Sequence, residues 1–372
     1  MKRLKVAVVT GTRAEFGIFR PVLRAIEASR KLRLQLVVTG MHLQKEFGGT
    51  VRDISAEGFE IAAKVPMYKR GDTPGQSLAR GTAGLAAAFG SLKPDMVMVL
   101  GDRLEILAAA NAALACQISL AHLHGGEVAP GQWDEQIRHA VTKMAHLHFC
   151  ATKKAGERIL QMGEDPTSVH VVGAPALDLA MDFVNNFWRT EGRDEAVRSV
   201  LLLLHPSSAD EALEERRTRM VLHSLRGQRV VVIGPNNDPG HRGILRAYER
   251  ARVKVATSLP QEFFWIRLAM SDIMVGNSSS GILEAATFAI PAINLGDRQK
   301  GRERNPNVID IPWNAGTQGI AAAIQKSRSS RFQKTLACRD NLYGDGHAAA
   351  RIVRVLEAVI PPISAVKRFH DR

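Results

Sequence analysis

The sequence predicts an α/β protein made of two doubly wound, Rossmann-like domains that face each other across a cleft. Short, near-continuous apolar runs alternate with longer amphipathic stretches along most of the chain. This alternation stops after residue 173 and starts again near residue 195. The length of 372 residues also exceeds what one ordinary core holds. Together these observations favour one α/β domain following another.

The first half predicts parallel strands that are buried on both faces, because such strands read as continuous apolar runs. We expect strands at 4–10, 34–39, 96–100, 119–123, 147–150 and 169–172. The intervening helices are expected at 19–29, 73–92, 105–115, 135–143 and 153–162.

The second half repeats the pattern after a break that opens with Gly-Ala-Pro at residues 173–175. Strands are expected at 200–204, 230–233, 253–255, 273–275 and 292–295, with helices at 211–225, 242–250, 261–271 and 282–289. A last helix at 347–359 should end before two prolines. The expected organisation is therefore a first domain at 1–173, a hinge at 174–194, a second domain at 195–346, and a helix with a basic tail at 347–372.

Composition excludes several classes of protein. No window is apolar enough for a membrane span, and the start lacks a signal-peptide cleavage site. The three cysteines lie far apart, which predicts neither a disulfide nor a metal centre and favours the cytoplasm. The net charge of +13 raises the possibility of nucleic acid, but the basic residues are scattered. An anionic small substrate explains the charge more simply.

Polar residues follow the first and third predicted runs, where ligands bind in open α/β sheets. Gly11 and its neighbours can let a phosphate approach backbone N–H groups, with Arg13 adding donors; the alternative is a plain turn. Asp102 and Arg103 follow the run at 96–100. Asp102 can face the cleft or simply cap the next helix.

Several candidate site residues lie in the stretch that follows the run at 119–123. The motif His124-Gly125-Gly126-Glu127 leaves a carboxylate on a glycine-rich loop, and Asp134, Glu135 and Arg138 come shortly after it. Converging carboxylates suit proton transfer, although Asp134 and Glu135 would also suit an ordinary helix N-terminus. Histidines beside carboxylates invite a metal site, but no third ligand is evident, so we expect none.

In the second half, His205 follows the run at 200–204, where it is either structural or active in proton transfer or phosphate contact. Asn237 and Asp238 lie in a polar loop after the next run; this loop can line the cleft or merely turn.

A serine-rich turn follows the run at 273–275. Ser279, Ser280 and Gly281 enter the next predicted helix, which favours a diphosphate cradle over an ordinary cap. Glu284 is better suited to ribose hydroxyls than to phosphate, and Arg302 can add positive charge.

Taken together, these motifs resemble the hydrolysing UDP-N-acetylglucosamine 2-epimerase family, on the branch used for sialic- and legionaminic-type acids. The resemblance extends to about Val359. Its carriers, in family order, are Gly11-Thr12-Arg13-Ala14-Glu15, Gly101-Asp102-Arg103, His124-Gly125-Gly126-Glu127, Asp134-Glu135-Gln136-Ile137-Arg138-His139-Ala140, His205-Pro206, Pro235-Asn236-Asn237-Asp238, Asn277-Ser278-Ser279-Ser280-Gly281 and Gly301-Arg302-Glu303.

The resemblance implies a GT-B-like fold and anti-elimination of UDP to a glycal, followed by hydration to the 2-epimeric free sugar, N-acetylmannosamine. It implies no cofactor, a UDP-sugar as partner and a homodimer. By matching position, Asp102, Glu127, Asp134 and His205 would be catalytic. Binding of the UDP-sugar would fall to Arg13, Arg103, Glu135, Arg138, Asn237, Asp238, Ser279, Ser280, Gly281, Glu284 and Arg302.

Four alternatives stay open at this point. The same chemistry can act on UDP-2,4-diacetamido-2,4,6-trideoxyglucose, or a non-hydrolysing epimerase can keep UDP attached. A GT-B glycosyltransferase would need an acceptor. A nucleic-acid-binding module would show salt-dependent retention and no turnover.

Overall fold

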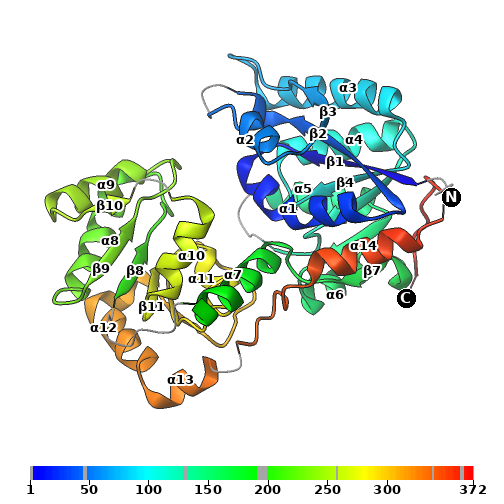
Figure 1. Cartoon of the computed structure of the whole chain (residues 1–372). Coiled ribbons are helices and arrows are strands. Elements are labelled where there is room, and N and C mark those ends of the chain that lie inside the picture. Colours follow the sequence, from blue (N-terminus) through cyan, green and yellow to red (C-terminus); the bar gives the residue numbers. More distant parts are fainter. Residues whose placement is uncertain are drawn as a thin grey trace. The chain divides into compact units, whose positions relative to one another are not determined.

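The computed structural model describes residues 3–44, 48–128, 133–190, 199–256, 259–336, 339–360 and 364–371. The chain divides into two compact units: unit 1 comprises Met1–Leu179 and Tyr343–Arg372, and unit 2 comprises Ala180–Leu342. Each unit is a parallel sheet with helices around it (Figure 1). The prediction of two doubly wound α/β domains is confirmed.

The sheet of unit 1 has the order β3-β2-β1-β4-β5-β6-β7, and its strands pair in parallel. The strand order reverses between β1 and β4, the kind of switch point beside which open α/β sheets bind ligands. The strands are β1 (Leu4–Thr10), β2 (Leu32–Thr39), β3 (Ile61–Val65), β4 (Met96–Leu100), β5 (Ser119–Leu123), β6 (Leu147–Cys150) and β7 (Val169–Val171).

Helices bury both faces of this sheet. Successive side chains of a strand point to opposite faces, so Val6 and Val8 of β1 join one core while Ala7 and Val9 join another. The helices are α1 (Arg13–Ala28), α2 (Val51–Ala56), α3 (Pro74–Leu92), α4 (Leu104–Ala115), α5 (Trp133–Met144), α6 (Lys153–Gln161) and α14 (Ala348–Ala358), with 3-10 turns at Gly40–Leu43 and Pro166–Ser168.

Unit 2 repeats the design with the order β10-β9-β8-β11-β12-β13 and a switch point between β8 and β11. Its strands are β8 (Val200–Leu203), β9 (Val230–Ile233), β10 (Val255–Ala256), β11 (Ile273–Gly276), β12 (Ala292–Leu295) and β13 (Val308–Ile311). Its helices are α8 (Glu211–Ser224), α9 (His241–Arg250), α10 (Gln261–Ala269), α11 (Ser280–Leu283), α12 (Gly316–Ser327) and α13 (Ser330–Leu336), with a 3-10 turn at Trp313–Ala315.

Several elements differ from those expected. β3 and β13 are edge strands with half-exposed residues such as Lys64 and Asp310, so they lack a continuous apolar run. The expected hinge at 174–194 contains helix α7 (Ala176–Thr190), while 191–198 lie outside the described residues. Phe183 of α7 packs on Trp265 and Phe288 in unit 2.

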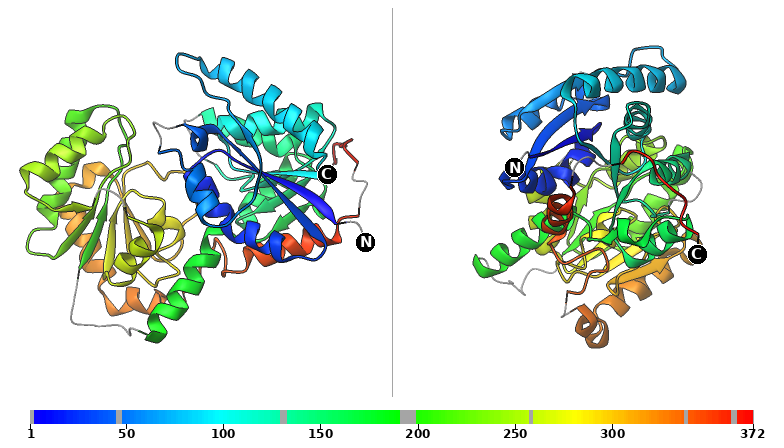
Figure 2. Two further views of the ribbon diagram at one scale, coloured as in Figure 1. Left: turned by 45° about the horizontal axis from the view of Figure 1, so that its top comes forward. Right: turned by 90° about the vertical axis from the view of Figure 1, so that its right-hand side faces the viewer.

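The end of the chain returns to unit 1. Helix α14 packs against α1, as Figures 1 and 2 show, and buries Ile352 and Leu356 in the core. The carboxylate of Asp178 accepts hydrogen bonds from the N–H groups of Ala348 and Ala349, at 2.9 and 2.7 Å. A carboxylate at a helix N-terminus is stabilising, so this contact fixes where α14 begins.

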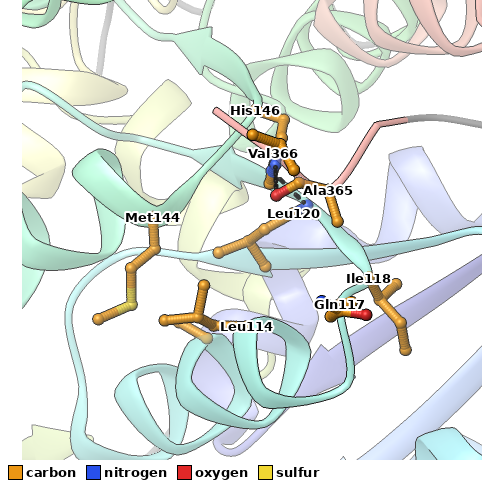
Figure 3. A pocket seen from close by; sticks show the side chains of 9 residues that line it. Leu114, Gln117, Ile118, Leu120, Met144, His146, Ala365 and Val366 are labelled. Atoms are coloured by element: carbon orange, nitrogen blue, oxygen red, sulfur yellow. Dashed lines mark hydrogen bonds between the residues drawn. The ribbon is translucent and has the colours of Figure 1, made fainter. Parts of the chain in front are cut away.

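The tail after α14 covers a small apolar pocket (Figure 3). The carbonyl of Ala365 accepts a hydrogen bond from Nε2 of His146 at 3.1 Å. The pocket lies near the amino ends of the strands, at the sheet edge opposite Asp102, and is lined by Ala110, Leu114, Gln117, Ile118, Leu120, Met144, His146, Ala365 and Val366.

Candidate active site

Three segments of unit 1 bring charged groups together at the carboxyl edge of the sheet. Asp102 follows β4 after one glycine, Glu127 lies in the loop after β5, and Arg138 lies in α5. The Arg138 guanidinium forms an ion pair with the Asp102 carboxylate and lies 4.0 Å from Oε2 of Glu127. Arg138 is only 6% exposed, so this cation sits where charge interactions are poorly screened.

His124 joins this group, although the sequence analysis did not include it among the site residues. Its Nδ1 lies 2.5 Å from Oε1 of Glu127. The buried Nε2 has no hydrogen-bond partner among the described residues. The loop needs glycine at Gly126, since a Cβ there would lie 2.2 Å from the carbonyl of Ala155. A carboxylate and an imidazole in contact can exchange a proton with a substrate.

A second charged group lies beside the first, beneath the ends of β1 and β4. Nε of Arg103 lies 3.4 Å from Glu105 and 3.9 Å from Glu15, and both glutamates are buried. Burial, together with the nearby Glu105, raises the pKa of Glu15 to about 8. Burial and a hydrogen bond to Glu105 also raise the pKa of Tyr68. Sequence reasoning missed both glutamates, because they sit inside helices and look like solvent-facing charges.

Gly11, the glycine after β1, contacts both glutamates. The N–H of Gly11 donates to Oε2 of Glu15 at 2.7 Å. A Cβ at Gly11 would lie 2.7 Å from Cγ of Glu105, and one at Gly40 would lie 2.6 Å from it. The expectation that Gly11 exposes its N–H to a phosphate is therefore wrong. Glycine is needed here so that the Glu105 side chain fits.

The remaining predicted residues of unit 1 lie around these two groups. Arg13 is exposed at the start of α1. Burial raises the pKa of Asp134, with Arg103 opposing the shift. Glu135 is partly buried and lies 3.3 Å from Nε2 of His139, one turn further along α5.

In unit 2, His205 is fixed at the switch point between β8 and β11. The side chain of Asn277 accepts a hydrogen bond from the His205 N–H at 2.7 Å and donates one to its carbonyl at 2.8 Å. The N–H of Asn236 donates to Nδ1 of His205 at 3.0 Å. Burial lowers the pKa of His205 to about 4, so the ring is neutral at pH 7. Because Nδ1 accepts, Nε2 carries the proton.

An arginine that sequence reasoning missed lies beside this histidine. Arg298 pairs with Asp238 at 3.6 Å and donates to the carbonyl of Asn277 at 3.4 Å. Arg298 follows β12. The rule that ligands bind beyond the carboxyl ends of parallel strands therefore also pointed to this residue. Burial lowers the pKa of Arg298, and the nearby positive charge of Arg302 lowers it further. Asn237 is exposed.

The serine-rich turn leads into less helix than expected. Helix α11 ends at Leu283, and turns at 284–289 replace the rest of the helix predicted at 282–289. Ser280 begins α11, and its backbone N–H lies 3.3 Å from Oγ of Ser278. Ser279 precedes this helix, and Gly281 is buried within it. A helix of one turn carries little macrodipole, so any diphosphate contact depends on local hydroxyl and N–H groups.

Glu284 points into unit 2. Its Oε1 accepts a hydrogen bond from Nε1 of Trp265 at 2.7 Å. Burial raises the pKa of Glu284, against hydrogen bonds from Trp265 and Ser280. Part of its acceptor capacity is therefore already used within the unit.

The described residues hold neither a metal-binding cluster nor a membrane-spanning helix. Among them, no cluster of three or more His, Cys, Asp or Glu side chains has a geometry that could hold a metal ion. No helix in the described ranges is long and apolar enough to cross a membrane.

The fold and site define a protein with two doubly wound α/β units, each with polar side chains at its switch point. A sequence model described as UDP-N-acetylglucosamine 2-epimerase matches residues 24–357. The chain therefore belongs to the UDP-N-acetylglucosamine 2-epimerase family, and the predicted resemblance is confirmed.

Individual relatives agree over nearly the whole chain. It is 35% identical to a UDP-N,N'-diacetylbacillosamine 2-epimerase (hydrolyzing) of Legionella pneumophila, over 95% of this chain and 96% of that one. It is 31% identical to a UDP-N-acetylglucosamine 2-epimerase of Neisseria meningitidis, over 100% and 99%. A crystal structure of UDP-GlcNAc 2-epimerase from Neisseria meningitidis bound to UDP-GlcNAc superposes with a TM-score of 0.80, at 18% identity over 95% and 99% of the two chains. This last likeness supports the fold.

Proposed function

We propose that this chain is a hydrolysing UDP-sugar 2-epimerase that converts UDP-N-acetylglucosamine and water to N-acetylmannosamine and UDP. The observation that carries the proposal is the meeting of Asp102 and Glu127 at one buried guanidinium, that of Arg138. Two carboxylates in different surroundings can divide the acid and base roles of a two-step reaction.

In the first step a base removes the proton at C2, the C1–O bond breaks, and UDP leaves as a glycal forms. Glu127 suits the base, because its contact with His124 gives the accepted proton a second site. In the second step water adds its oxygen to C1 and C2 regains a proton on the opposite face. Asp102 suits the water-handling role, since its carboxylate is held by Arg138 and is still 19% exposed.

His205 suits the departure of UDP. A neutral ring with its proton on Nε2 can donate a hydrogen bond to a phosphate oxygen, while the N–H of Asn236 holds the other ring nitrogen. Arg298 and Arg302 supply positive charge nearby. Electrostatic stabilisation of this kind acts on the charge that develops on the leaving group.

Proton NMR of UDP-N-acetylglucosamine incubated with the enzyme in deuterated water tests the proposal. We expect free UDP and N-acetylmannosamine with deuterium at C2. UDP-N-acetylmannosamine as the product would instead indicate a non-hydrolysing epimerase. An unchanged substrate with no acceptor present would favour a glycosyltransferase.

A second substrate is favoured by the relative at 35% identity, which is named for UDP-N,N'-diacetylbacillosamine. This sugar is the 2,4-diacetamido-2,4,6-trideoxy analogue, and its reacting C1 and C2 are the same. Parallel measurements of UDP release from both sugars decide between them, since the better substrate has the higher kcat/KM.

A further inference from the structure

One buried histidine, His122 in β5, contacts two segments that carry site residues. Its Nε2 lies 2.8 Å from the carbonyl oxygen of Gly101, the residue before Asp102. Its Nδ1 lies 3.1 Å from Oγ1 of Thr142, which is one turn after Arg138 in α5. The ring is completely buried, so it cannot touch the substrate itself.

The same pair of side chains supports the loop that carries Glu127. A Cβ at Gly125 would lie 3.0 Å from Nδ1 of His122 and 2.9 Å from Oγ1 of Thr142. The glycine loop therefore rests directly on the histidine and the threonine.

We propose that His122 is a positioning residue of the reaction, whose ring sets the relative placement of Asp102, Glu127 and Arg138. The proposal rests on the proposed function, because positioning acquires meaning only if these three groups handle the sugar. A displacement of about 1 Å in such a group can reduce the rate about 100-fold.

The hydrogen bonds fix the state of the ring. Burial lowers the pKa of His122 to about 3, with neighbouring His148 and His124 acting in the same direction, so the ring is neutral. A neutral ring that donates from Nε2 to the Gly101 carbonyl must accept at Nδ1. The single hydroxyl proton of Thr142, which can donate to the carbonyl of Arg138 at 2.9 Å, is then shared between that carbonyl and Nδ1 of His122.

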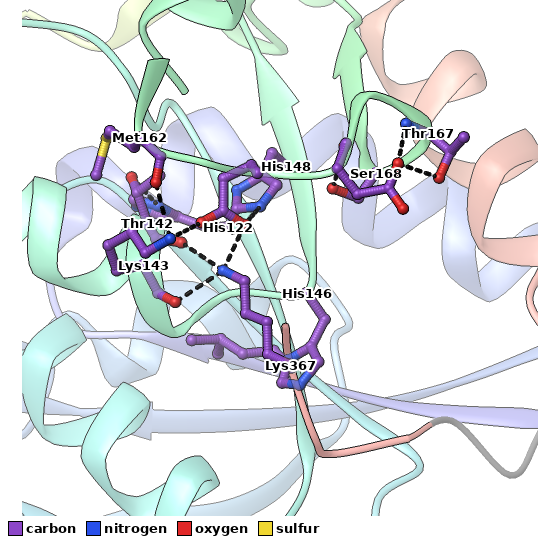
Figure 4. A network of polar contacts seen from close by, with 12 residues as sticks. His122, Thr142, Lys143, His146, His148, Met162, Thr167, Ser168 and Lys367 are labelled. Carbon is purple, nitrogen blue, oxygen red and sulfur yellow. Dashed lines mark hydrogen bonds and ion pairs between the residues drawn. The ribbon is translucent and has the colours of Figure 1, made fainter. Parts of the chain in front are cut away.

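A matched control lies next to His122. His148 of β6 is its register partner, is also completely buried, and has the same ring (Figure 4). Its Nε2 contacts Glu164 at 3.0 Å instead of a segment with a site residue. Loss of either ring removes buried hydrogen bonds, but only His122 contacts the three site segments.

The experiment measures kcat and KM for UDP release, with folded protein quantified for each variant. We expect His122→Leu to lower kcat about 100-fold while KM changes less than about threefold. His122→Gln should regain about tenfold, because its amide N–H can reach the Gly101 carbonyl. Thr142→Val, which removes the other contact, should lower kcat about tenfold. His148→Leu should stay within about twofold of the wild type.

Equal kcat values for His122→Leu and His148→Leu would overturn the proposal. If His122→Leu does not fold, a wild-type kcat in both Thr142→Val and His122→Gln would overturn it equally. If the wild type releases no UDP from either sugar, the proposed function fails instead. Crystal structures then test the positioning: the Asp102–Arg138 ion pair should be separated in Thr142→Val and intact in His148→Leu, and an intact pair in both refutes the inference.

Discussion

Buried Glu15 predicts one contribution to the stability of unit 1 that falls as the pH rises through neutrality. Glu15 is 4% exposed and faces Glu105, Arg103 and the N–H of Gly11. Burial first, and then Glu105, raise its pKa to about 8 from an ordinary 4.5. The folded unit therefore prefers the protonated carboxyl at pH values where the unfolded chain is ionised.

The sign and size follow from proton linkage. Because the folded pKa exceeds the unfolded one, the contribution of Glu15 to stability is complete below pH 4.5 and is lost as the pH approaches 8. Each pH unit in this range costs about 1.4 kcal/mol for one proton. Between about pH 5.5 and about pH 7.5 the Glu15 contribution to the free energy of unfolding should fall by about 2–3 kcal/mol. Buried histidines of unit 1 with lowered pKa, such as His42 and His122, contribute with the opposite sign over this range, so the Glu15 contribution is measured as the difference between the wild type and Glu15→Gln.

The variant Glu15→Gln should remove this dependence. Its amide oxygen can still accept a hydrogen bond from the Gly11 N–H, and its amide N–H can donate to Glu105. Unlike the carboxyl group, the amide does not gain or lose a proton in this pH range. We expect the free energy of unfolding of the wild type, relative to that of this variant, to fall by about 2–3 kcal/mol over the same pH range, because the histidine contributions are common to both proteins and cancel. Amide hydrogen exchange of β1 and β4 measures this quantity for unit 1 alone, so unfolding of unit 2 does not interfere.

Glu164→Gln provides a control of opposite sign. Burial raises the pKa of Glu164, but hydrogen bonds from His148, Lys143 and Lys367 outweigh it and hold the pKa at about 2. Its contribution is therefore present above pH 4.5 and lost only as the pH falls towards 2. This variant should lose about 2–3 kcal/mol equally at both pH values. A stability difference between the wild type and Glu15→Gln that is the same at both pH values would refute the reasoning.

Three further outcomes follow from the site. Glu127→Gln should slow UDP release by about 10²–10⁴-fold with unchanged thermal unfolding, and near-normal release would remove Glu127 from the catalytic role. Arg138→Met should cost about 3 kcal/mol in urea unfolding at pH 7, because it leaves Asp102 and Glu127 without their buried cation; a loss below about 1 kcal/mol would contradict this. Gly11→Ala should cost about 1–3 kcal/mol in the same assay, since its Cβ would overlap Glu105; wild-type stability would show that the Glu105 side chain has another place to go.

The central strands could be predicted from the sequence, because a strand that is buried on both faces has a continuous run of apolar residues. β4, β5, β9 and β12 have the predicted bounds. The edge strands β3 and β13 were missed because one side of each meets solvent. The length of α11 was also missed: the run at 282–289 is apolar enough for a helix, but turns place its residues in the core.

The candidate site was predicted where it depends on strand ends and missed where it depends on burial. Asp102 and Glu127 follow glycines just after predicted strands, so their positions in the sequence were enough to predict them as site residues. Glu15 and Glu105 lie in helices, and only their tertiary surroundings show that they are buried and share an arginine. His122 lies inside an apolar strand, where a histidine gives no sign of what its two nitrogens contact.

The carboxylates beside Arg103 and those beside Arg138 differ in how far they are exposed. Arg103 lies beside Glu105 and Glu15, whose side chains are 0% and 6% exposed, so neither can reach a substrate without unfolding its surroundings. The carboxylates beside Arg138 are 15–19% exposed and sit on segments that end at the sheet edge. Of these two groups, the Arg138 group is therefore the one that suits the proposed base for the C2 proton.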